Sequence, residues 1–193
     1  MTDVYIVQKL ENNKDIIVNV PGSKSITNRA LMLAALSDGE CNLDGVLFSD
    51  DSRAFLDCLE KLGFQLFIDE NEKRVKVVGT SGEIPNRKAT IDVRSAGTAA
   101  RFLTVMLAVT GGEYTLNSSE KMKKRPMGEI IDLLRNAGVK ISCLEEEGHF
   151  PFIISSNGLD KKEVSINTDT SSQYASALLM AAVMTGLKIK LTG

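Results

Sequence analysis

Val20-Pro21-Gly22-Ser23-Lys24-Ser25-Ile26-Thr27-Asn28-Arg29 is the stretch that decides the fold, and an apolar run over residues 30–36 follows it directly. The β-branched residues Ile16, Ile17 and Val18 predict a strand that stops at the Pro-Gly turn. Good helix formers predict a helix that begins within a few residues of this turn. A strand therefore leads through a short polar loop into a helix N-terminus.

The polar loop carries groups that suit an anion. Free backbone N–H groups and the positive end of the helix dipole gather at a helix N-terminus. The hydroxyls of Ser23 and Ser25 and the cations of Lys24 and Arg29 lie beside them. A phosphate or a carboxylate fits this place, although the loop does not match the Walker A pattern. A serine cap with solvated cations explains the same residues and stays open as the simpler alternative.

The composition is that of an ordinary globular protein. The 193 residues are 43% hydrophobic and 25% charged, with a formal net charge of −2. Without an overall positive charge, and with only 5% aromatic residues, the chain is not expected to bind nucleic acid. No apolar run reaches the roughly 18 to 20 residues of a membrane helix, and no signal-peptide pattern opens the chain. We therefore expect a cytoplasmic protein.

Cysteine and histidine give no sign of a metal site or of a catalytic triad. Cys41, Cys58 and Cys143 are scattered and form no Cys-x-x-Cys pair, which argues against a disulfide framework and a zinc site. His149 is the only histidine and lies in a stretch typical of a turn into a strand. We therefore do not expect it to serve in a Ser-His-Asp arrangement.

The sequence repeats itself at a constant interval. Val18-Asn19-Val20, Ile91-Asp92-Val93 and Val164-Ser165-Ile166 follow one another at equal spacing, and each leads through small polar residues into a helix rich in Ala, Leu and Met. The first two copies continue with a strand, an amphipathic helix and a hairpin, which makes the unit βαβαββ. The third copy stops at Gly193 after a strand, a helix and a strand, and from this we expect a longer polypeptide.

These repeats predict the fold class and the domain plan. We expect an α/β (α+β) protein in which repeated βαβαββ units pack around a pseudo-threefold axis, with the third unit incomplete. The repeats cover about residues 17–80, 89–156 and 163–193, within one globule over 17–193.

The loops after the three first strands are expected to converge. They combine hydroxyls, cations and an amide, and hold Lys24, Ser25 and Arg29, then Ser95, Gly97, Thr98 and Arg101, then Thr170, Ser171, Ser172 and Gln173. Such a set predicts a site for a phosphorylated and carboxylated small molecule. Three helix caps would explain the hydroxyls, but neither the cations nor Gln173.

A further basic stretch, Lys121-Met122-Lys123-Lys124-Arg125-Pro126, lies between a predicted strand and the next helix. A solvated charge run is the simpler explanation for its lysines. Arg125, directly before Pro126, stands where a guanidinium can bind a carboxylate or phosphate with two hydrogen bonds.

Six separated motifs follow one another along nearly the whole chain: Pro21-Gly22-Ser23-Lys24-Ser25, Asn28-Arg29-Ala30-Leu31, Ser49-Asp50-Asp51, Ala96-Gly97-Thr98-Ala99 with Arg101, Lys123-Lys124-Arg125-Pro126-Met127 and Ser171-Ser172-Gln173. In this order and spacing the chain resembles the bacterial 5-enolpyruvylshikimate-3-phosphate synthases. The resemblance implies two globules of three βαβαββ units each, with the active site between them. This chain would supply the N-terminal globule, and residues 1–16 would belong to the second one.

The resemblance also implies a transferase of the shikimate pathway, which leads to chorismate and the aromatic amino acids. The reaction moves the enolpyruvyl group of phosphoenolpyruvate to the 5-hydroxyl of shikimate 3-phosphate and releases phosphate, without a metal or an organic cofactor. The partners would be these two substrates and the C-terminal globule, with no nucleic acid and no membrane. The complete enzyme would be a monomer, and its N-terminal fragment would be inactive alone.

Motif by motif, the resemblance implies a role for individual residues. Ser25 and Arg29 would hold the shikimate moiety, with Thr98 beside it. The 3-phosphate would be bound by Ser171 and Ser172.

The remaining matched residues would face phosphoenolpyruvate. Lys24 would touch both substrates and Arg125 would pair with phosphoenolpyruvate, which makes these two the catalytic candidates. Gly97 would leave room for phosphoenolpyruvate, at the place where the herbicide glyphosate binds in sensitive members. Gln173 would lie between the two substrates.

Two departures from the family pattern concern the loop before the second central helix. Arg94-Ser95 stands where the family usually has Gly-Asn, and Phe102 replaces a proline that is common in glyphosate-sensitive members. Both affect the expected geometry of the substrate loop and the response to the inhibitor.

Two alternatives remain open at this stage. The sister family that transfers enolpyruvate to UDP-N-acetylglucosamine typically has Lys-Asn in the first loop and a loop cysteine. This chain has Lys24-Ser25 and no cysteine between Cys58 and Cys143. The second alternative is an anion-binding module without catalysis.

Overall fold

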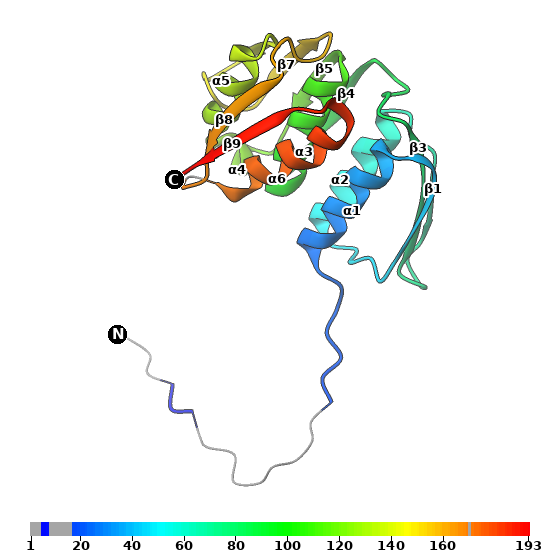
Figure 1. The fold of residues 1–193 in the computed structure, drawn as a ribbon. Helices are drawn as coiled ribbons and strands as arrows, with labels where there is room; N and C mark the ends of the chain where they lie inside the picture. The colour runs from blue at the N-terminus through cyan, green and yellow to red at the C-terminus, as the bar shows by residue number, and fades with distance from the viewer. Residues whose placement is uncertain (1–4, 8–16, 170) are drawn as a thin grey trace.

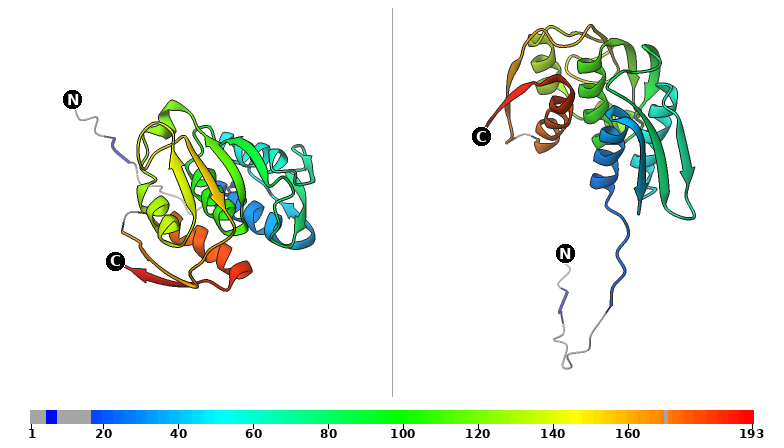
Figure 2. Two further views of the ribbon diagram at one scale, coloured as in Figure 1. Left: turned by 90° about the horizontal axis from the view of Figure 1, so that it is seen from above. Right: turned by 45° about the vertical axis from the view of Figure 1, so that its right-hand side comes forward.

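The computed structural model describes residues 5–7, 17–169 and 171–193, which form three successive α/β units (Figure 1). The first unit contains α1 (Lys24–Leu36), β1 (Asp38–Asp44), α2 (Asp50–Lys61), β2 (Leu66–Asp69) and β3 (Arg74–Thr80). Its three strands form an antiparallel sheet in the order β1-β3-β2. Figure 2 shows this sheet as one outer wall of the molecule.

The second unit is the complete one. It contains β4 (Lys88–Asp92), α3 (Gly97–Thr110), β5 (Gly112–Asn117), α4 (Glu120–Lys123), α5 (Gly128–Asn136), β6 (Lys140–Cys143) and β7 (Phe152–Ser156). The sheet order is β4-β5-β7-β6, in which β4 lies parallel to β5 and the other neighbours are antiparallel. This is the βαβαββ unit that the repeat predicts, with the short helix α4 added.

The third unit consists of β8 (Glu163–Asn167), α6 (Ser172–Thr185) and β9 (Lys188–Thr192), with β8 parallel to β9. Among the described residues, the third unit therefore ends as the sequence predicts, after a strand, a helix and a strand. The expected fold class is confirmed. No helix in the described part of the chain is long and apolar enough to span a membrane.

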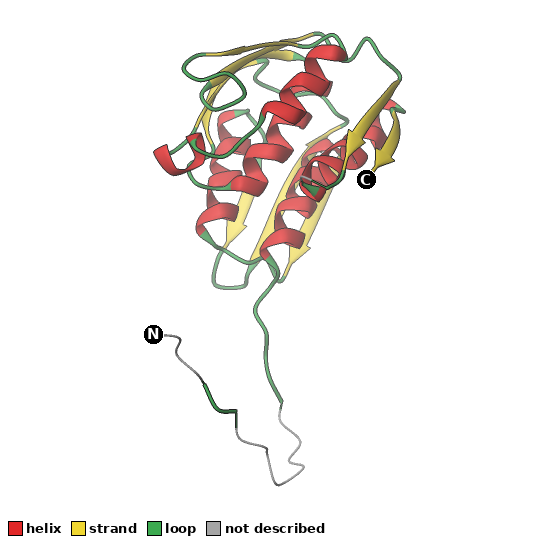
Figure 3. Ribbon diagram, turned by 90° about the vertical axis from the view of Figure 1, so that its left-hand side faces the viewer, coloured by secondary structure: helices red, strands yellow, loops and turns green. Residues whose placement is uncertain are grey.

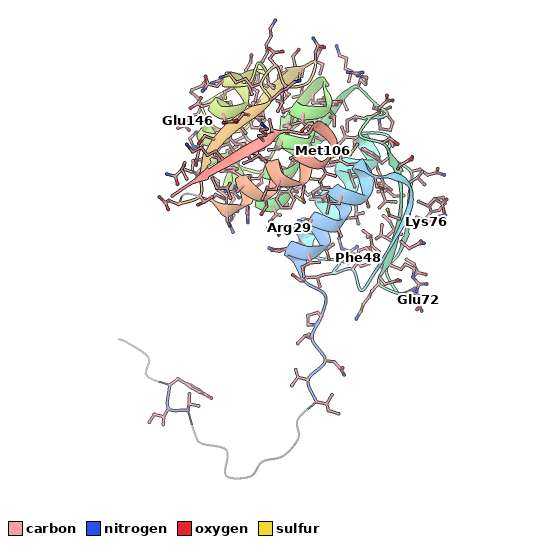
Figure 4. The ribbon with its side chains drawn as sticks, viewed as in Figure 1. Arg29, Phe48, Glu72, Lys76, Met106 and Glu146 are labelled. Carbon is pink, nitrogen blue, oxygen red and sulfur yellow. The ribbon has the colours of Figure 1, made fainter. Side chains whose placement is uncertain are left out.

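Helices α1, α2, α3 and α6 pack against one another in the centre, and the strands lie outside them (Figure 3). Helix α3 is buried almost throughout, from Gly97 to Val109, because α1, α2, α6 and β7 all contact it. This explains why its sequence shows a long apolar run instead of an amphipathic pattern. Its side chains, including Met106 (Figure 4), form the middle of the hydrophobic core.

Serine side chains start several of these helices. Ser23 accepts a hydrogen bond from the backbone N–H of Ile26 at the start of α1, and Ser49 and Ser52 form a reciprocal capping box at α2. Ser119 caps α4, a helix that the sequence analysis did not predict because the basic run obscured it.

One predicted strand is wrong. The described residues before α1, 17–23, contain no strand, and Ile17, Val18 and Val20 are exposed. The rest of the predicted strand and of the N-terminal segment 1–16 lies outside the described residues, apart from 5–7. β-Branched residues favour extended backbone, but a strand also needs a partner. In the described structure β1 pairs only with β3.

The central position of α3 predicts a large loss of stability when its core side chains are shortened. Leu103 is fully buried in α3, whereas Leu179 of α6 is 52% exposed. Leu103→Ala should lower the free energy of unfolding by about 2–5 kcal/mol. The matched Leu179→Ala should lower it by less than about 1 kcal/mol. Urea unfolding followed by circular dichroism measures both, and equal losses would contradict the central role of α3.

Candidate anion-binding site

The N-terminal parts of α1, α3 and α6 meet through side chains of the helices themselves. Arg29 of α1 donates to the hydroxyl of Ser176 on α6 at 3.1 Å. Its guanidinium also lies 5.3 Å from the centre of the Phe102 ring on α3. Figure 4 labels Arg29 on the lower part of α1. One cation thus connects all three units, as expected from the repeat.

A second arginine joins α3 to α6. Arg101 donates to the amide oxygen of Gln173 at 2.9 Å and to the backbone oxygen of Gly97 at 3.2 Å. Its guanidinium lies 5.4 Å from the centre of the Tyr174 ring. Because Arg101 uses the amide oxygen of Gln173, the NH₂ group of that amide remains the part available to donate to a ligand.

Gly97 stands where Arg101 and Arg125 approach each other. A Cβ atom added to Gly97 would lie 2.6 Å from a terminal nitrogen of Arg125 and 3.0 Å from one of Arg101. The backbone of Gly97 does not need a positive φ, so glycine serves close approach here and not a turn. Two guanidinium groups repel each other, and an anion between them would offset that repulsion.

The N-terminus of α3 has no side-chain cap. Its cap residue is Ala96, whereas Ser23 caps α1 and Ser171 caps α6 by accepting from the N–H of Gln173. The first N–H groups of α3 therefore have no hydroxyl cap of their own. Helix capping alone explains why Ser23 and Ser171 stand in their loops, which is the simpler alternative to a binding site. It does not explain the residues of the loop before α3.

Lys24 lies in the same region but has a partner. Its ammonium group lies 3.2 Å from a carboxylate oxygen of Asp51 at the start of α2, and its side chain is half exposed. Asp50, Asp51 and Ser95 border a hollow of about 210 Å³ next to this pair. The site is therefore open to solvent on the side of Lys24.

The loop before α3 is tied to α2 and to the start of α4. Arg94 has a positive φ of 51° and its guanidinium pairs with Asp57. The hydroxyl of Ser95 lies 2.7 Å from that of Ser119. These contacts fix the loop in which this chain departs from the usual family pattern, although Arg94 occupies a conformation that glycine adopts more easily.

Some of the predicted site residues contact one another, and others only lie in neighbouring segments. Gly97, Gln173, Arg101 and Arg125 form one cluster, whereas Arg29 contacts Ser176 and the Phe102 ring. Lys24, Ser25, Thr98, Ser171 and Ser172 lie in the adjoining loops or first helical turns. Thr170 lies outside the described residues.

Sequence reasoning did not predict several supporting contacts, although it named Phe102 and Asp51 for other reasons. Ser176, Phe102 and Tyr174 hold the two arginines, and Asp51 holds Lys24. Tyr174 directly follows Gln173 and could have been noticed for that reason. Spacing gives no signal for Ser176, which is far from Arg29 in the sequence. In the described residues no group of three or more His, Cys, Asp or Glu side chains is arranged to hold a metal ion.

Comparison with known proteins identifies relatives of this chain. Residues 9–193 match the family model for EPSP synthase (3-phosphoshikimate 1-carboxyvinyltransferase). The 3-phosphoshikimate 1-carboxyvinyltransferase of Trichormus variabilis is 39% identical over 180 residues, and that of Neisseria meningitidis serogroup B is 44% identical over 185 residues. Both alignments cover 93% of this chain and 42% of the relative.

The fold is also that of solved structures. EPSP synthase from Acinetobacter baumannii superimposes with a TM-score of 0.76 at 26% identity, over 86% of this chain and 38% of that protein. The chain thus spans less than half the length of the curated relatives and of the solved structure that it matches. On the family match and this shared fold, the chain belongs to the EPSP synthase family.

Proposed function

We propose that this chain carries the shikimate 3-phosphate-binding part of a cytoplasmic transferase that moves the enolpyruvyl group of phosphoenolpyruvate to the 5-hydroxyl of shikimate 3-phosphate. The observation that supports this most is the cluster of Arg101, Arg125 and Gln173 around Gly97, at the N-terminus of α3 that has no side-chain cap. Arg29 lies over Phe102 of the same helix. Such a cluster suits a ligand with both phosphate and carboxylate groups. The part of the relatives that this chain does not match would supply the other half of the site.

In this proposal the three units divide the substrates between them. Ser25 and Arg29 bind the shikimate moiety with Thr98 beside it, and Ser171 and Ser172 bind the 3-phosphate. Hydroxyls and backbone N–H groups at the start of α6 give the 3-phosphate several donors at once. The position of Ser172 as the first residue of α6 supports this role.

In this proposal phosphoenolpyruvate binds between Lys24, Gly97 and Arg125. The NH₂ group of Gln173 donates hydrogen bonds to the substrates. Two substrates that are both polyanions repel each other, so cations between them are needed to bring the 5-hydroxyl close to the enolpyruvyl carbon. The same cations offset charge as the tetrahedral intermediate forms. Lys24 and Arg125 are therefore the catalytic candidates.

The proposed binding site can be tested on this chain alone. Calorimetric titration with shikimate 3-phosphate should show saturable binding, and Lys24→Ala and Ser171→Ala should each weaken it about tenfold or more, since each removes a donor to an anion. Lys140→Ala is the matched control, because Lys140 is exposed on β6 and away from the helix N-termini. Equal affinities of the Lys24 and Lys140 variants would contradict the assigned site.

Gly97 provides a test of the phosphoenolpyruvate position. Gly97→Ala places a methyl group against the tips of Arg125 and Arg101, so binding of phosphoenolpyruvate in the presence of shikimate 3-phosphate should fall about tenfold. Gly128→Ala is the control, since its Cβ would meet only ordinary contact at 3.8 Å. Titration of both variants measures the effect, and an unchanged affinity of Gly97→Ala would place phosphoenolpyruvate elsewhere.

The sister family usually has a cysteine in a loop as acid, and Cys58 does not suit that role because it is buried within α2. Burial raises the pKa of the Cys58 thiol to about 12, with a further contribution from Asp92. The thiol is buried on α2 and donates to the backbone oxygen of Asp92 at 3.4 Å. At neutral pH it is therefore protonated, and its burial keeps it from contact with a substrate.

The raised pKa predicts selective alkylation. At pH 8, iodoacetamide should modify Cys41 and Cys143, which are both partly exposed, at least about a hundredfold faster than Cys58. The Cys58 rate should rise with pH, because the thiolate fraction grows until the pH reaches the pKa. Mass spectrometry of peptides after timed reaction gives the three rates. Reaction of Cys58 as fast as Cys41 would show that the thiol is accessible.

The non-catalytic alternative makes a different prediction. It concerns a protein of the relatives' full length that includes this chain. Phosphate release from phosphoenolpyruvate that depends on shikimate 3-phosphate would support the transferase. Binding of both substrates without phosphate release would support an anion-binding module instead.

A further inference from the structure

Tyr174 is a buried tyrosine whose ring and hydroxyl contact two different segments of the site. It lies in the first turn of α6 and is only 2% exposed. Its ring faces the guanidinium of Arg101, which lies 5.4 Å from the ring centre. Its hydroxyl donates to the backbone oxygen of Pro126 at 2.9 Å. The contact with Arg101 needs only the ring, so the hydroxyl requires an explanation of its own.

The internal repeat explains why the ring meets Arg101. The step along the sequence from Arg101 to Tyr174 equals the step from Ile91 to Val164, which occupy matching places in the parallel pairs β4–β5 and β8–β9. Arg101 and Tyr174 therefore hold equivalent positions on α3 and α6, and these two helices pack against each other. The hydrogen bond to Pro126 does not follow from the repeat, because the equivalent residue of α3 is an arginine.

Pro126 belongs to the short segment between α4 and α5 that carries Arg125. The N–H of Arg125 donates to a backbone oxygen of α4 at 2.9 Å, and the N–H of Met127 donates to the backbone oxygen of Gly148 at 2.8 Å. Both acceptors belong to the second unit, as the segment itself does. Tyr174 reaches the segment from the third unit, and it does so from the interior, since Pro126 is exposed.

Proline makes this hydrogen bond effective for Arg125. Its ring fixes φ and also restricts the backbone of the residue before it. A hydrogen bond to the carbonyl group of Pro126 therefore limits the movement of the Arg125 backbone as well. The guanidinium groups of Arg125 and Arg101 both approach Gly97. One tyrosine is thus connected to both arginines that meet at the start of α3.

We propose that Tyr174 is a positioning residue, which holds the guanidinium groups of Arg101 and Arg125 at a spacing that suits an anion between them. The ring orients Arg101 without cancelling its charge, and the hydroxyl holds the segment that carries Arg125. Tyr174 acts through these two residues and not by contact with a substrate. That the anion is phosphoenolpyruvate rests on the proposed function.

Tyr174→Phe removes the hydroxyl and keeps the ring, and Tyr114→Phe is its matched control. Tyr114 is also buried, and its hydroxyl donates to the backbone oxygen of Gly111 at 2.9 Å. Gly111 lies at the C-terminal end of α3, the opposite end from Gly97. Each substitution removes one hydrogen bond from a buried hydroxyl to a backbone oxygen, so both should lower the stability of the fold.

Hydrogen exchange tests the anchoring without a ligand. In Tyr174→Phe the amides of Arg125 and Met127 should exchange at least about fivefold faster than in the control variant, because their segment opens locally without its hydrogen bond to α6. The amide of Val139, which donates to a backbone oxygen of α5 at 3.0 Å, is the reference for changes in overall stability. Equal exchange of the Arg125 and Met127 amides in both variants, relative to Val139, would overturn the proposal.

Calorimetric titration tests the consequence for the ligand. With shikimate 3-phosphate present, phosphoenolpyruvate should bind Tyr174→Phe about fivefold more weakly than Tyr114→Phe. Shikimate 3-phosphate alone should bind both variants equally, since the Ser171 cap of α6 is retained. An equal phosphoenolpyruvate affinity of the two variants, or an equal loss for both substrates, would overturn the positioning role.

The two measurements separate this proposal from the proposed function. If the unmodified chain bound neither substrate, the proposed function would be contradicted. The exchange comparison between Tyr174→Phe and Tyr114→Phe would still decide whether Tyr174 anchors the segment of Arg125.

Discussion

The burial of α3 is the constraint on which the rest of the structure depends. Because α1, α2, α6 and β7 all pack on this one helix, its length and apolar surface determine where the other helices lie. Helices packed around a common neighbour, each preceded by a polar loop, bring their N-terminal ends to one place. The candidate anion site is therefore a consequence of core packing, and its Arg101 lies near the N-terminal end of α3, which is buried almost throughout.

Neutral groups, and not carboxylates, hold Arg29 and Arg101 in the described structure. Arg29 rests on Phe102 and donates to Ser176, and Arg101 rests on Tyr174 and donates to Gln173. An aromatic face orients a guanidinium without cancelling its charge, and a hydroxyl or amide oxygen does the same. The positive charge thus stays available to a ligand. Phe102, which replaces a common proline of the family, contributes directly to this arrangement.

The sequence predicted what is local and missed what depends on tertiary contacts. The internal repeat, the three polar loops and the residues at their helix N-termini follow from local patterns, and the structure confirms the elements that carry them apart from the strand before α1. The contacts Arg29–Ser176 and Lys24–Asp51 join distant segments, so no spacing rule reveals them. The strand expected before α1 is wrong for the same reason, because extended propensity does not provide a partner strand.

The cations of the site differ in how firmly they are held, and this bears on how the site can respond to a ligand. The guanidinium of Arg101 is fixed by two hydrogen bonds and an aromatic ring. Within the described residues Lys24 has the half-exposed ion pair with Asp51, a kind of contact that contributes about 0–1 kcal/mol. A phosphate can replace that carboxylate at little cost. Asp51 would still be stabilised by the N-terminus of α2, so Lys24 can move with a ligand while Arg101 stays in place.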